Sequence, residues 1–369
     1  MTSRPAHASE PHAPSPTAMS EYTWAQVLTN LLARRHLSPA AASWATDQIV
    51  TGLATPVQTA GFLTALRAKG ETVEEIAAIA DTVRQRAVPV TVPGPTADIA
   101  GTGGDGGSVV NVSTIAAIVA AATGVRMLKH GGRAASSATA GAADLIEGLG
   151  IPLDLTPQQA QQVALEAGIT FLFAPQFNPG LRHAGPVRRE LGIPTVLNTI
   201  GPLLNPAAPT ASVIGVADAR AAPLVAQVLA AQGRQGLVAR GHDGLDKLTT
   251  TTTSDVWVVH GGRVRAHVLD PRELGFASAA PETLHGGDPA TNAVTTRAVL
   301  NGRTGAVRDI VILNAAAVLV ALDPGSGSLA DLKEAFAAAV VRCGAALDEG
   351  AAAATLNRWI GSAARAGDT

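Results

Sequence analysis

A glycine-rich segment carries the clearest chemical signal in this chain. Residues 98–107 read DIAGTGGDGG, and Asn111, Ser113 and Thr114 follow at the start of an apolar stretch. A glycine loop between a strand and a helix lets backbone N–H groups approach an anion, and the helix N-terminus adds its dipole. Hydroxyls beside that loop add donors for phosphate oxygens, or a ligand for a metal ion bound to them. Five glycines in residues 101–107 exceed what an ordinary turn requires, so we predict a phosphate site.

A second segment of the same kind follows the next β-like run. Residues 129–137 read KHGGRAASS, which places Lys129 and Arg133 beside glycines and two serine hydroxyls. Lysine acts on phosphate as a point charge, whereas arginine can bind two oxygens at once. The alternative is an ordinary basic loop. Two such segments after consecutive strands favour a diphosphate site, because open sheets bind ligands at the carboxyl ends of neighbouring strands.

The glycine loop also permits a dinucleotide-binding interpretation. Gly101, Gly103 and Gly106 fit the pattern G-x-G-x-x-G. That fingerprint expects an acidic residue about 20 positions later for the ribose hydroxyls. This chain has Arg126 and Lys129 in that region. An NADP site therefore remains only as a weaker alternative.

Two further segments contain groups that suit a substrate and a metal. Arg188 and Arg189 precede a segment, residues 197–206, that reads LNTIGPLLNP, and one arginine here suits a substrate carboxylate. Taken singly, either arginine is more often a salt-bridged helix residue. In residues 242–254, HDGLDKLTTTTTS, the Asp246 carboxylate is a hard oxygen ligand suited to Mg²⁺ that bridges a diphosphate. A lone aspartate is more often a turn residue, so Asp246 gains weight only from the other segments.

Helix-start signals and β-like runs predict the elements that position these groups. Thr23 with Gln26 and Thr72 with Glu75 form plausible capping boxes, and Ser38-Pro39 and Thr55-Pro56 place an N-cap before proline. After a Pro-rich linker, residues 88–95, short β-like runs alternate with Ala-rich helical stretches, which indicates βαβ units. The β-like runs are 97–100, 125–128, 169–173, 212–215, 236–239 and 255–259.

The predicted fold class is α/β, with a small helical N-terminal domain and a larger α/β domain that has a mostly parallel central sheet. We expect residues 1–20 to be a disordered tail, 21–90 the helical domain and 96–369 the phosphate-binding α/β domain. Part of residues 175–205 is expected to pack with the helical domain.

Composition limits the class of protein. The 369 residues are 47% hydrophobic but only 3% aromatic, which favours an α/β core of small aliphatic side chains. The net charge of −2 gives no basic footprint for nucleic acid, and no apolar stretch is long enough for a membrane helix. Cys343 is the only cysteine, so a disulfide framework is excluded and a reducing, cytoplasmic location is expected.

Together these segments resemble the anthranilate phosphoribosyltransferase family of tryptophan biosynthesis. The resemblance spans roughly residues 22–360 and consists of several long motifs in the family's order. The matching stretches are GTGGD with NVST, KHGGRAASS with GAADLIEGLG, VRRELGIPTVLNTIGPLLNP, HDGLDKLTTTTTS, GGDPATNA and RDIVILNAAA.

The resemblance implies transfer of the phosphoribosyl group from 5-phosphoribosyl 1-diphosphate to the amino group of anthranilate. Diphosphate is released, in the second step from chorismate. The resemblance also implies Mg²⁺ as cofactor, bound by Ser113 and Asp246, and a homodimer formed through the helical domain. Lys129 and Arg188 are expected to be catalytic, with Arg188 at the acceptor carboxylate. The substrate-binding residues so implied are Gly101, Gly104, Asp105, Val109, Asn111, Val112, Ser113, Thr114, Lys129, His130, Gly131, Gly132, Arg133, Ala134, Ala135, Ser136, Ser137 and Arg188.

The chain departs from the family at four positions. Gly132 and Asn178 stand where the family has asparagine and histidine on the acceptor side, and Leu197 stands where it prefers phenylalanine. The family's Asp-Glu metal pair is Asp246-Lys247 here, which we expect to weaken one Mg²⁺ site unless the lysine neutralises diphosphate itself. These changes leave three alternatives open: a related transferase with another acceptor, a nucleoside phosphorylase, or a non-catalytic ligand-binding relative.

Overall fold

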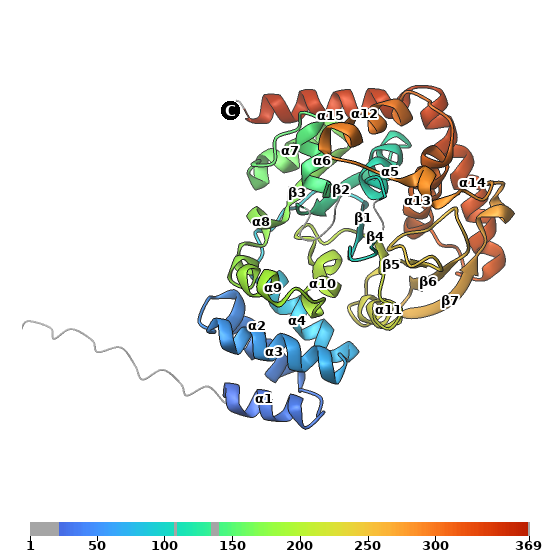
Figure 1. Cartoon of the computed structure of the whole chain (residues 1–369). Helices are drawn as coiled ribbons and strands as arrows, with labels where there is room; N and C mark the ends of the chain where they lie inside the picture. The colour runs from blue at the N-terminus through green and yellow to red at the C-terminus, as the bar shows by residue number, and fades with distance from the viewer. Residues whose placement is uncertain (1–21, 107–108, 134–139, 368–369) are drawn as a thin grey trace, which may run out of the picture.

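The structure of the chain is a computed structural model that describes residues 22–106, 109–133 and 140–367 (Figure 1). A group of helices from the N-terminal part of the chain lies beside a larger body built around a central sheet. This arrangement confirms the predicted fold class. The predicted tail, residues 1–20, lies outside the described residues.

The helices alternate with strands through the middle of the chain and dominate its two ends. The helices are α1 (Trp24–Leu32), α2 (Pro39–Val50), α3 (Pro56–Lys69), α4 (Val73–Gln85), α5 (Val112–Ala122), α6 (Ala142–Gly148), α7 (Pro157–Ala167), α8 (Ala174–Phe177), α9 (Gly185–Leu191), α10 (Val196–Ile200), α11 (Ala221–Ala231), α12 (Pro289–Leu300), α13 (Ala306–Leu322), α14 (Leu329–Asp348) and α15 (Ala351–Gly367). The strands are β1 (Thr96–Gly101), β2 (Arg126–Gly131), β3 (Ile169–Phe173), β4 (Ala211–Gly215), β5 (Gln235–Gly241), β6 (Ser254–His260) and β7 (Arg263–Leu269).

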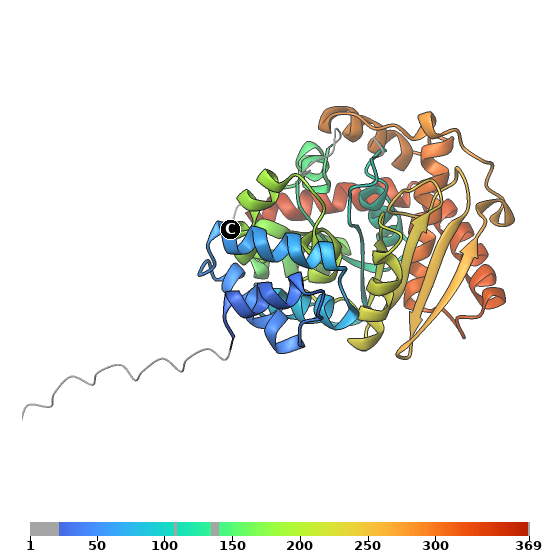
Figure 2. The same cartoon turned by 60° about the horizontal axis from the view of Figure 1, so that its bottom comes forward.

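Within the described residues the strands form one seven-stranded sheet of order β3-β2-β1-β4-β5-β6-β7. The first five strands of that order run parallel, and β6 and β7 are antiparallel additions at one edge (Figure 2). The carboxyl ends of β1, β2, β4 and β5 therefore face the same way. The sequence runs predicted β1 to β6 but not β7, because its charged residues Arg263 and Arg265 mask the alternation of an exposed edge strand.

The four N-terminal helices begin where the sequence signals predict. Thr23, Thr55 and Thr72 each accept a hydrogen bond from the backbone three residues on and form capping boxes. Ser38 caps α2 in the same way, with Pro39 at the first helical position. Such a side chain satisfies an N–H group that has no partner within the helix.

Two hydrophobic cores lie on opposite faces of the sheet. On one face α5 and α13 pack together and against the strands, and α14 and α15 pack on α5; Ile115 and Ile118 of α5 are fully buried. On the other face α11 packs against both the sheet and α4, so one core runs from the sheet into the N-terminal helices. Ala184, Val196 and Ile200 belong to this second core. Helices α9 and α10 are thereby held between the N-terminal helices and the sheet.

Glu75, on α4, connects the end of α3 to the loop before α2 and supplies a test of this region. Its buried carboxylate accepts from the N–H of Leu37 (2.8 Å) and pairs with Lys69 (2.7 Å). Replacing Glu75 by alanine leaves a buried ammonium without its counter-charge, so Glu75→Ala should lower the free energy of unfolding by about 3–5 kcal/mol. Urea denaturation measures this, with Glu74→Ala at the exposed neighbouring position as the matched control. Equal effects of the two changes would show that Glu75 has no special role.

Candidate active site

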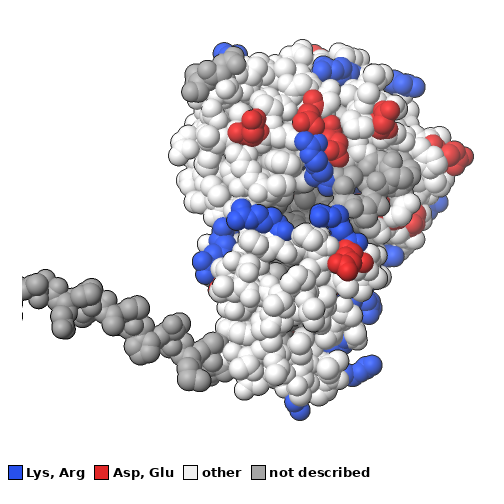
Figure 3. Space-filling model, turned by 60° about the vertical axis from the view of Figure 1, so that its left-hand side comes forward, with Lys and Arg blue, Asp and Glu red and all other residues white. Residues whose placement is uncertain are grey.

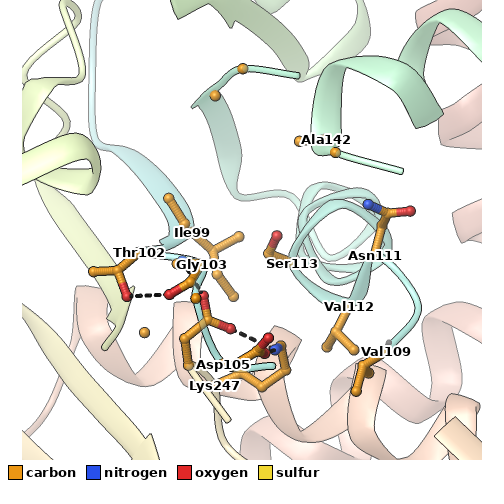
Figure 4. A pocket seen from close by; sticks show the side chains of 18 of the residues that line it. Ile99, Thr102, Gly103, Asp105, Val109, Asn111, Val112, Ser113, Ala142 and Lys247 are labelled. Atoms are coloured by element: carbon orange, nitrogen blue, oxygen red, sulfur yellow. Dashed lines mark hydrogen bonds and ion pairs between the residues drawn. The ribbon is translucent and has the colours of Figure 1, made fainter. Parts of the chain in front are cut away.

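A cavity of about 310 Å³ lies at the carboxyl ends of β1, β2, β4 and β5 (Figure 4). The structure brings most of the predicted site residues into its wall, namely Gly101, Gly104, Asp105, Val109, Asn111, Val112, Ser113, Lys129, His130, Gly131, Gly132, Arg133, Arg188 and Asp246. Thr114 is fully buried and does not line the cavity, so its assignment stays a prediction. The predicted residues Ala134, Ala135, Ser136 and Ser137 lie outside the described residues.

The glycine loop after β1 supplies backbone conformations that other residues rarely adopt. Gly103 and Gly104 have φ angles of +66° and +75°, in the left-handed region. The N–H of Gly103 donates to Oδ2 of Asp246 (2.7 Å). The loop is therefore fastened to the segment after β5.

The position of Asp246 in this contact requires two further glycines. A Cβ on Gly101 would lie 2.0 Å from Oδ2 of Asp246, and a Cβ on Gly215 would lie 1.6 Å from the Asp246 carbonyl oxygen. Gly101 and Gly215 are paired partners at the ends of β1 and β4. Only residues without a side chain permit Asp246 to lie across these two strand ends.

The N-terminus of α5 forms another wall of the cavity. Asn111 precedes the helix, and its Nδ2 donates to the carbonyl oxygen of Ala140 (2.7 Å). Its Oδ1 accepts from Asn292 of α12 (2.8 Å). These bonds place the first turn of α5, with Val112 and Ser113, against the cavity, where the helix dipole favours an anion.

Lys129, in the wall of the cavity, is almost entirely buried. Its Nζ donates to the carbonyl oxygen of Ile99 (2.8 Å) and to Oγ of Ser113 (3.3 Å). Burial lowers the pKa of Lys129 to about 8, although Asp98 and Asp246 favour its charged form. The charge of Lys129 is thus desolvated before any ligand binds, which strengthens its attraction for an anion.

His130 is held as a neutral ring on the next position of β2. Burial lowers its pKa to about 4, and the neighbouring charge of Lys129 adds to the effect. Nε2 of His130 lies 3.0 Å from Nδ2 of Asn178, which also donates to the carbonyl oxygen of Leu204 (3.2 Å). An amide N–H₂ only donates, so Nε2 accepts and the ring proton is on Nδ1.

The two arginines of the cavity differ in their partners. Arg133 binds Asp144 and Glu147 of α6 (2.8 Å each), and its guanidinium lies over the Phe173 ring. Arg188, on α9, is half-buried and its guanidinium makes no hydrogen bond or ion pair with a residue that the structure describes. Arg188 is therefore the better placed of the two to receive an anionic ligand.

Lys247 lies between two carboxylates of the cavity. Its Nζ is 2.6 Å from Oδ2 of Asp105 and 2.5 Å from Oδ1 of Asp246, and Figure 4 shows the Lys247 and Asp105 side chains pointing toward one another. Burial opposes the charge of Lys247, but the two carboxylates outweigh it and raise the pKa of this lysine. The ammonium therefore stays charged at neutral pH.

The other departures from the family pattern fall in three different environments. A Cβ on Gly132 would have its nearest neighbour 4.0 Å away, at Ala174, so the cavity has room for a side chain there. Asn178 is buried behind His130 and does not line the cavity. Leu197 belongs to the core shared with the N-terminal helices, so its change affects packing.

Several lining residues were absent from the predicted set, among them Gly215, Asn198 and Asn314. Gly215 ends β4, Asn198 belongs to α10, and Asn314 belongs to α13. Asn314 donates to the carbonyl oxygen of Leu248 (2.8 Å) and accepts from its N–H (3.2 Å), which fixes the segment next to Lys247. Asn198 and Asn314 lie in stretches that match the family, but spacing alone does not indicate which residue of a stretch reaches the site.

Positive charge on the surface gathers where the N-terminal helices meet the α/β body. On the face that Figure 3 shows, Lys and Arg side chains gather along the hollow between the N-terminal helices and the α/β body. A positive rim raises the local concentration of anionic ligands.

The fold and this cavity define a glycosyl transferase. Residues 93–353 match the family model described as the glycosyl transferase family, a/b domain, and residues 25–87 match its helical bundle domain. Because the chain matches this family, the dinucleotide-binding alternative is wrong.

Individual relatives narrow the class. The anthranilate phosphoribosyltransferase of Streptomyces griseus is 51% identical over 92% of this chain and 94% of its own length. The crystal structure of the anthranilate phosphoribosyltransferase of Thermus thermophilus superimposes with a TM-score of 0.84, 39% identity and coverage of 92% and 99%. The Saccharomyces cerevisiae enzyme in complex with PRPP and Mg gives a TM-score of 0.83, 29% identity and coverage of 94% and 99%. The chain belongs to the anthranilate phosphoribosyltransferase family, which confirms the resemblance seen in its sequence.

The close approach of Asp246 to β4 can be tested with one methyl group. Gly215→Ala should displace the Asp246–Lys247 segment, destabilise the fold by about 1–3 kcal/mol and weaken phosphoribosyl diphosphate binding about tenfold or more. Titration calorimetry and urea denaturation measure the two effects. Gly344→Ala, in α14 where a Cβ meets no atom within 4 Å, is the matched control and should leave affinity unchanged. Unchanged affinity in Gly215→Ala would show that phosphoribosyl diphosphate binding does not depend on the position of Asp246.

Proposed function

We propose that this chain transfers the phosphoribosyl group of 5-phosphoribosyl 1-diphosphate to the amino nitrogen of anthranilate, with Mg²⁺. The bond between C1 of the ribose and the diphosphate oxygen breaks, a bond from C1 to nitrogen forms, and the amine loses one proton. The observation that carries the proposal is the convergence on one cavity of the glycine loop, the start of α5, Lys129 and Asp246. All four provide positive charge, N–H donors or metal-binding oxygen.

The diphosphate belongs at the glycine loop and α5 in this proposal. Gly103 and Gly104 present backbone to the cavity, and Ser113 adds a hydroxyl. Lys129 contributes a charge that needs no reorganisation, because Ile99 and Ser113 already hold its Nζ. Fixed donors of this kind stabilise the charge that develops on a departing diphosphate.

The donor set suits Mg²⁺ only together with the substrate. No group of three or more His, Cys, Asp or Glu side chains that could hold a metal occurs among residues 22–106, 109–133 and 140–367. Asp246 and Ser113 supply oxygen atoms beside the cavity, and Mg²⁺ is commonly bound by one or two carboxylates plus substrate phosphates. When bound there, the ion supplies positive charge to the diphosphate. We therefore propose Ser113 and Asp246 as its protein ligands.

The acceptor belongs on the Arg188 side of the cavity. The unpartnered guanidinium can bind the anthranilate carboxylate through two parallel hydrogen bonds. An aromatic amine is unprotonated near neutral pH, so the reaction needs no strong general base. Orientation of the amine toward C1 and stabilisation of the leaving group then account for the rate.

Movement of the helical domain would close this cavity. We propose residues 21–90 and 96–369 as the two bodies, with α9 and α10 between them. Arg188 and Asn198 lie on these two helices, which pack on α3 and α4. Closure would bring Arg188 toward the phosphate side and exclude water from the sugar.

Loss of anthranilate fluorescence tests the activity directly. Purified chain, phosphoribosyl diphosphate and Mg²⁺ should together remove the fluorescence, and omission of any one component should prevent it. Loss with all three present separates this activity from a nucleoside phosphorylase, which would require inorganic phosphate and a nucleoside. Binding of phosphoribosyl diphosphate without any loss of fluorescence would instead indicate another acceptor or a non-catalytic relative.

Arg188 should act on the acceptor rather than on the phosphate substrate. Removing a charge-assisted hydrogen bond costs about 1.5–3 kcal/mol, so Arg188→Ala should raise the KM for anthranilate about tenfold to a hundredfold. The KM for phosphoribosyl diphosphate should change much less. Arg189→Ala, exposed at the next position, is the matched control. A larger effect on phosphoribosyl diphosphate would place Arg188 at the phosphates.

We also propose a homodimer formed through the helical domain, in a cytoplasmic location. Leu32, Leu53 and Val57 are 77%, 69% and 81% exposed on that domain, and a dimer interface there would remove such apolar side chains from water. A single buried cysteine suits a reducing compartment. Light scattering should give twice the mass of one chain for the wild type. The mass should be lower for Val57→Glu. A monomeric wild type would contradict the dimer. Cell fractionation tests the location.

A further inference from the structure

The position between Asp105 and Asp246 is already occupied by a cation that belongs to the chain. The Lys247 ammonium lies 2.6 Å and 2.5 Å from one oxygen of each carboxylate, and all three residues line the cavity. Two carboxylates that converge on one point in a phosphate-binding cavity are the arrangement in which a protein commonly binds a divalent metal. Here the ammonium fills that point.

We propose that Lys247 replaces a metal ion in this chain, so that phosphoribosyl diphosphate binds with a single divalent cation. This inference rests on the proposed function, because it concerns the same substrate. The single ion is the one between Ser113, Asp246 and the substrate, whereas the Asp105 side of the cavity uses the ammonium.

The surroundings hold Lys247 in place. Asp246 accepts from Gly103 and lies across the strand ends at Gly101 and Gly215, so its carboxylate cannot turn away. Asn314 binds both backbone groups of Leu248, the residue after Lys247. The Lys247 side chain is itself only 15% exposed. A metal ion could take the place of this ammonium only if both of its ion pairs, to Asp105 and Asp246, were broken.

The ammonium can also reach the substrate. Lysine has three N–H donors, and Asp105 and Asp246 are its two acceptors among the residues that the structure describes. The third donor is left for a phosphate oxygen in the cavity that Lys247 lines. Lysine acts in this way as a point charge at other phosphate sites.

The formal charges of Asp105, Asp246 and Lys247 also favour a single metal ion. Two carboxylates around one ammonium carry a net charge of −1, which a diphosphate tolerates once a metal ion and Lys129 contribute. A glutamate in place of Lys247 would make the cluster −3, and a diphosphate could approach it only with an added metal ion. The residue at position 247 therefore decides how many metal ions accompany the substrate.

Counting bound Mn²⁺ by electron paramagnetic resonance tests the inference without any turnover. The full chain is saturated with phosphoribosyl diphosphate and titrated with Mn²⁺ as the probe metal. We expect one Mn²⁺ per chain in the wild type and two in Lys247→Glu. Lys333→Glu, the same charge reversal in an exposed ion pair with Glu273, is the matched control and should keep one.

A second variant covers the case in which Lys247→Glu fails to fold. Lys247→Gln removes the cation without adding a ligand, and it should lower the affinity for phosphoribosyl diphosphate at one equivalent of Mn²⁺ about tenfold. Lys247→Arg keeps the charge and should retain most of the affinity. Circular dichroism checks the fold of each variant.

Two outcomes overturn the inference, and a third concerns a different claim. Two Mn²⁺ per chain in the wild type, or unchanged affinity in Lys247→Gln, would show that the ammonium replaces no metal. Either result leaves the proposed function intact. Absence of phosphoribosyl diphosphate binding by the wild type at any Mn²⁺ concentration would instead remove the proposed function, and this inference with it.

Discussion

The passage of Asp246 across the ends of β1 and β4 is the contact on which the rest of the site depends. It exists only because Gly101 and Gly215, paired in neighbouring strands, have no side chains. The contact gives the glycine loop its anchor, since Asp246 accepts from Gly103. It also brings Lys247 to Asp105. Two segments more than 140 positions apart in the chain thereby become one wall of a cavity.

The charged groups in and behind this cavity are desolvated. Lys129 is buried with Asp98, whose carboxylate accepts from Asn205 (2.7 Å) and from the N–H of His130 (3.3 Å). Burial raises the pKa of Asp98, and Lys129 opposes this. Buried charges of this kind contribute little to stability by themselves, because desolvation of the ions offsets their attraction. Their value is functional: the charges are already oriented when a phosphate arrives.

Local signals predicted much of the fold because they act between near neighbours. The caps at Thr23, Thr55 and Thr72 were visible as a threonine followed three residues later by glutamine or glutamate. The buried parallel strands were visible as short apolar runs. Strand β7 was missed because an exposed edge strand carries charged residues that resemble a loop. The domain boundaries and the roles of individual site residues remain predictions.

The sequence by itself determined the class of protein, the parallel sheet and the segments that form the site, because glycine loops, caps and apolar runs have a local physical meaning. Tertiary structure decided which residue of each segment faces the cavity. Arg133 turned to Asp144 and Glu147 whereas Arg188 kept no such partner, Thr114 turned into the core, and Lys247 came to lie between two carboxylates. These outcomes depend on distances between segments remote in the chain, and spacing along a sequence does not contain such distances.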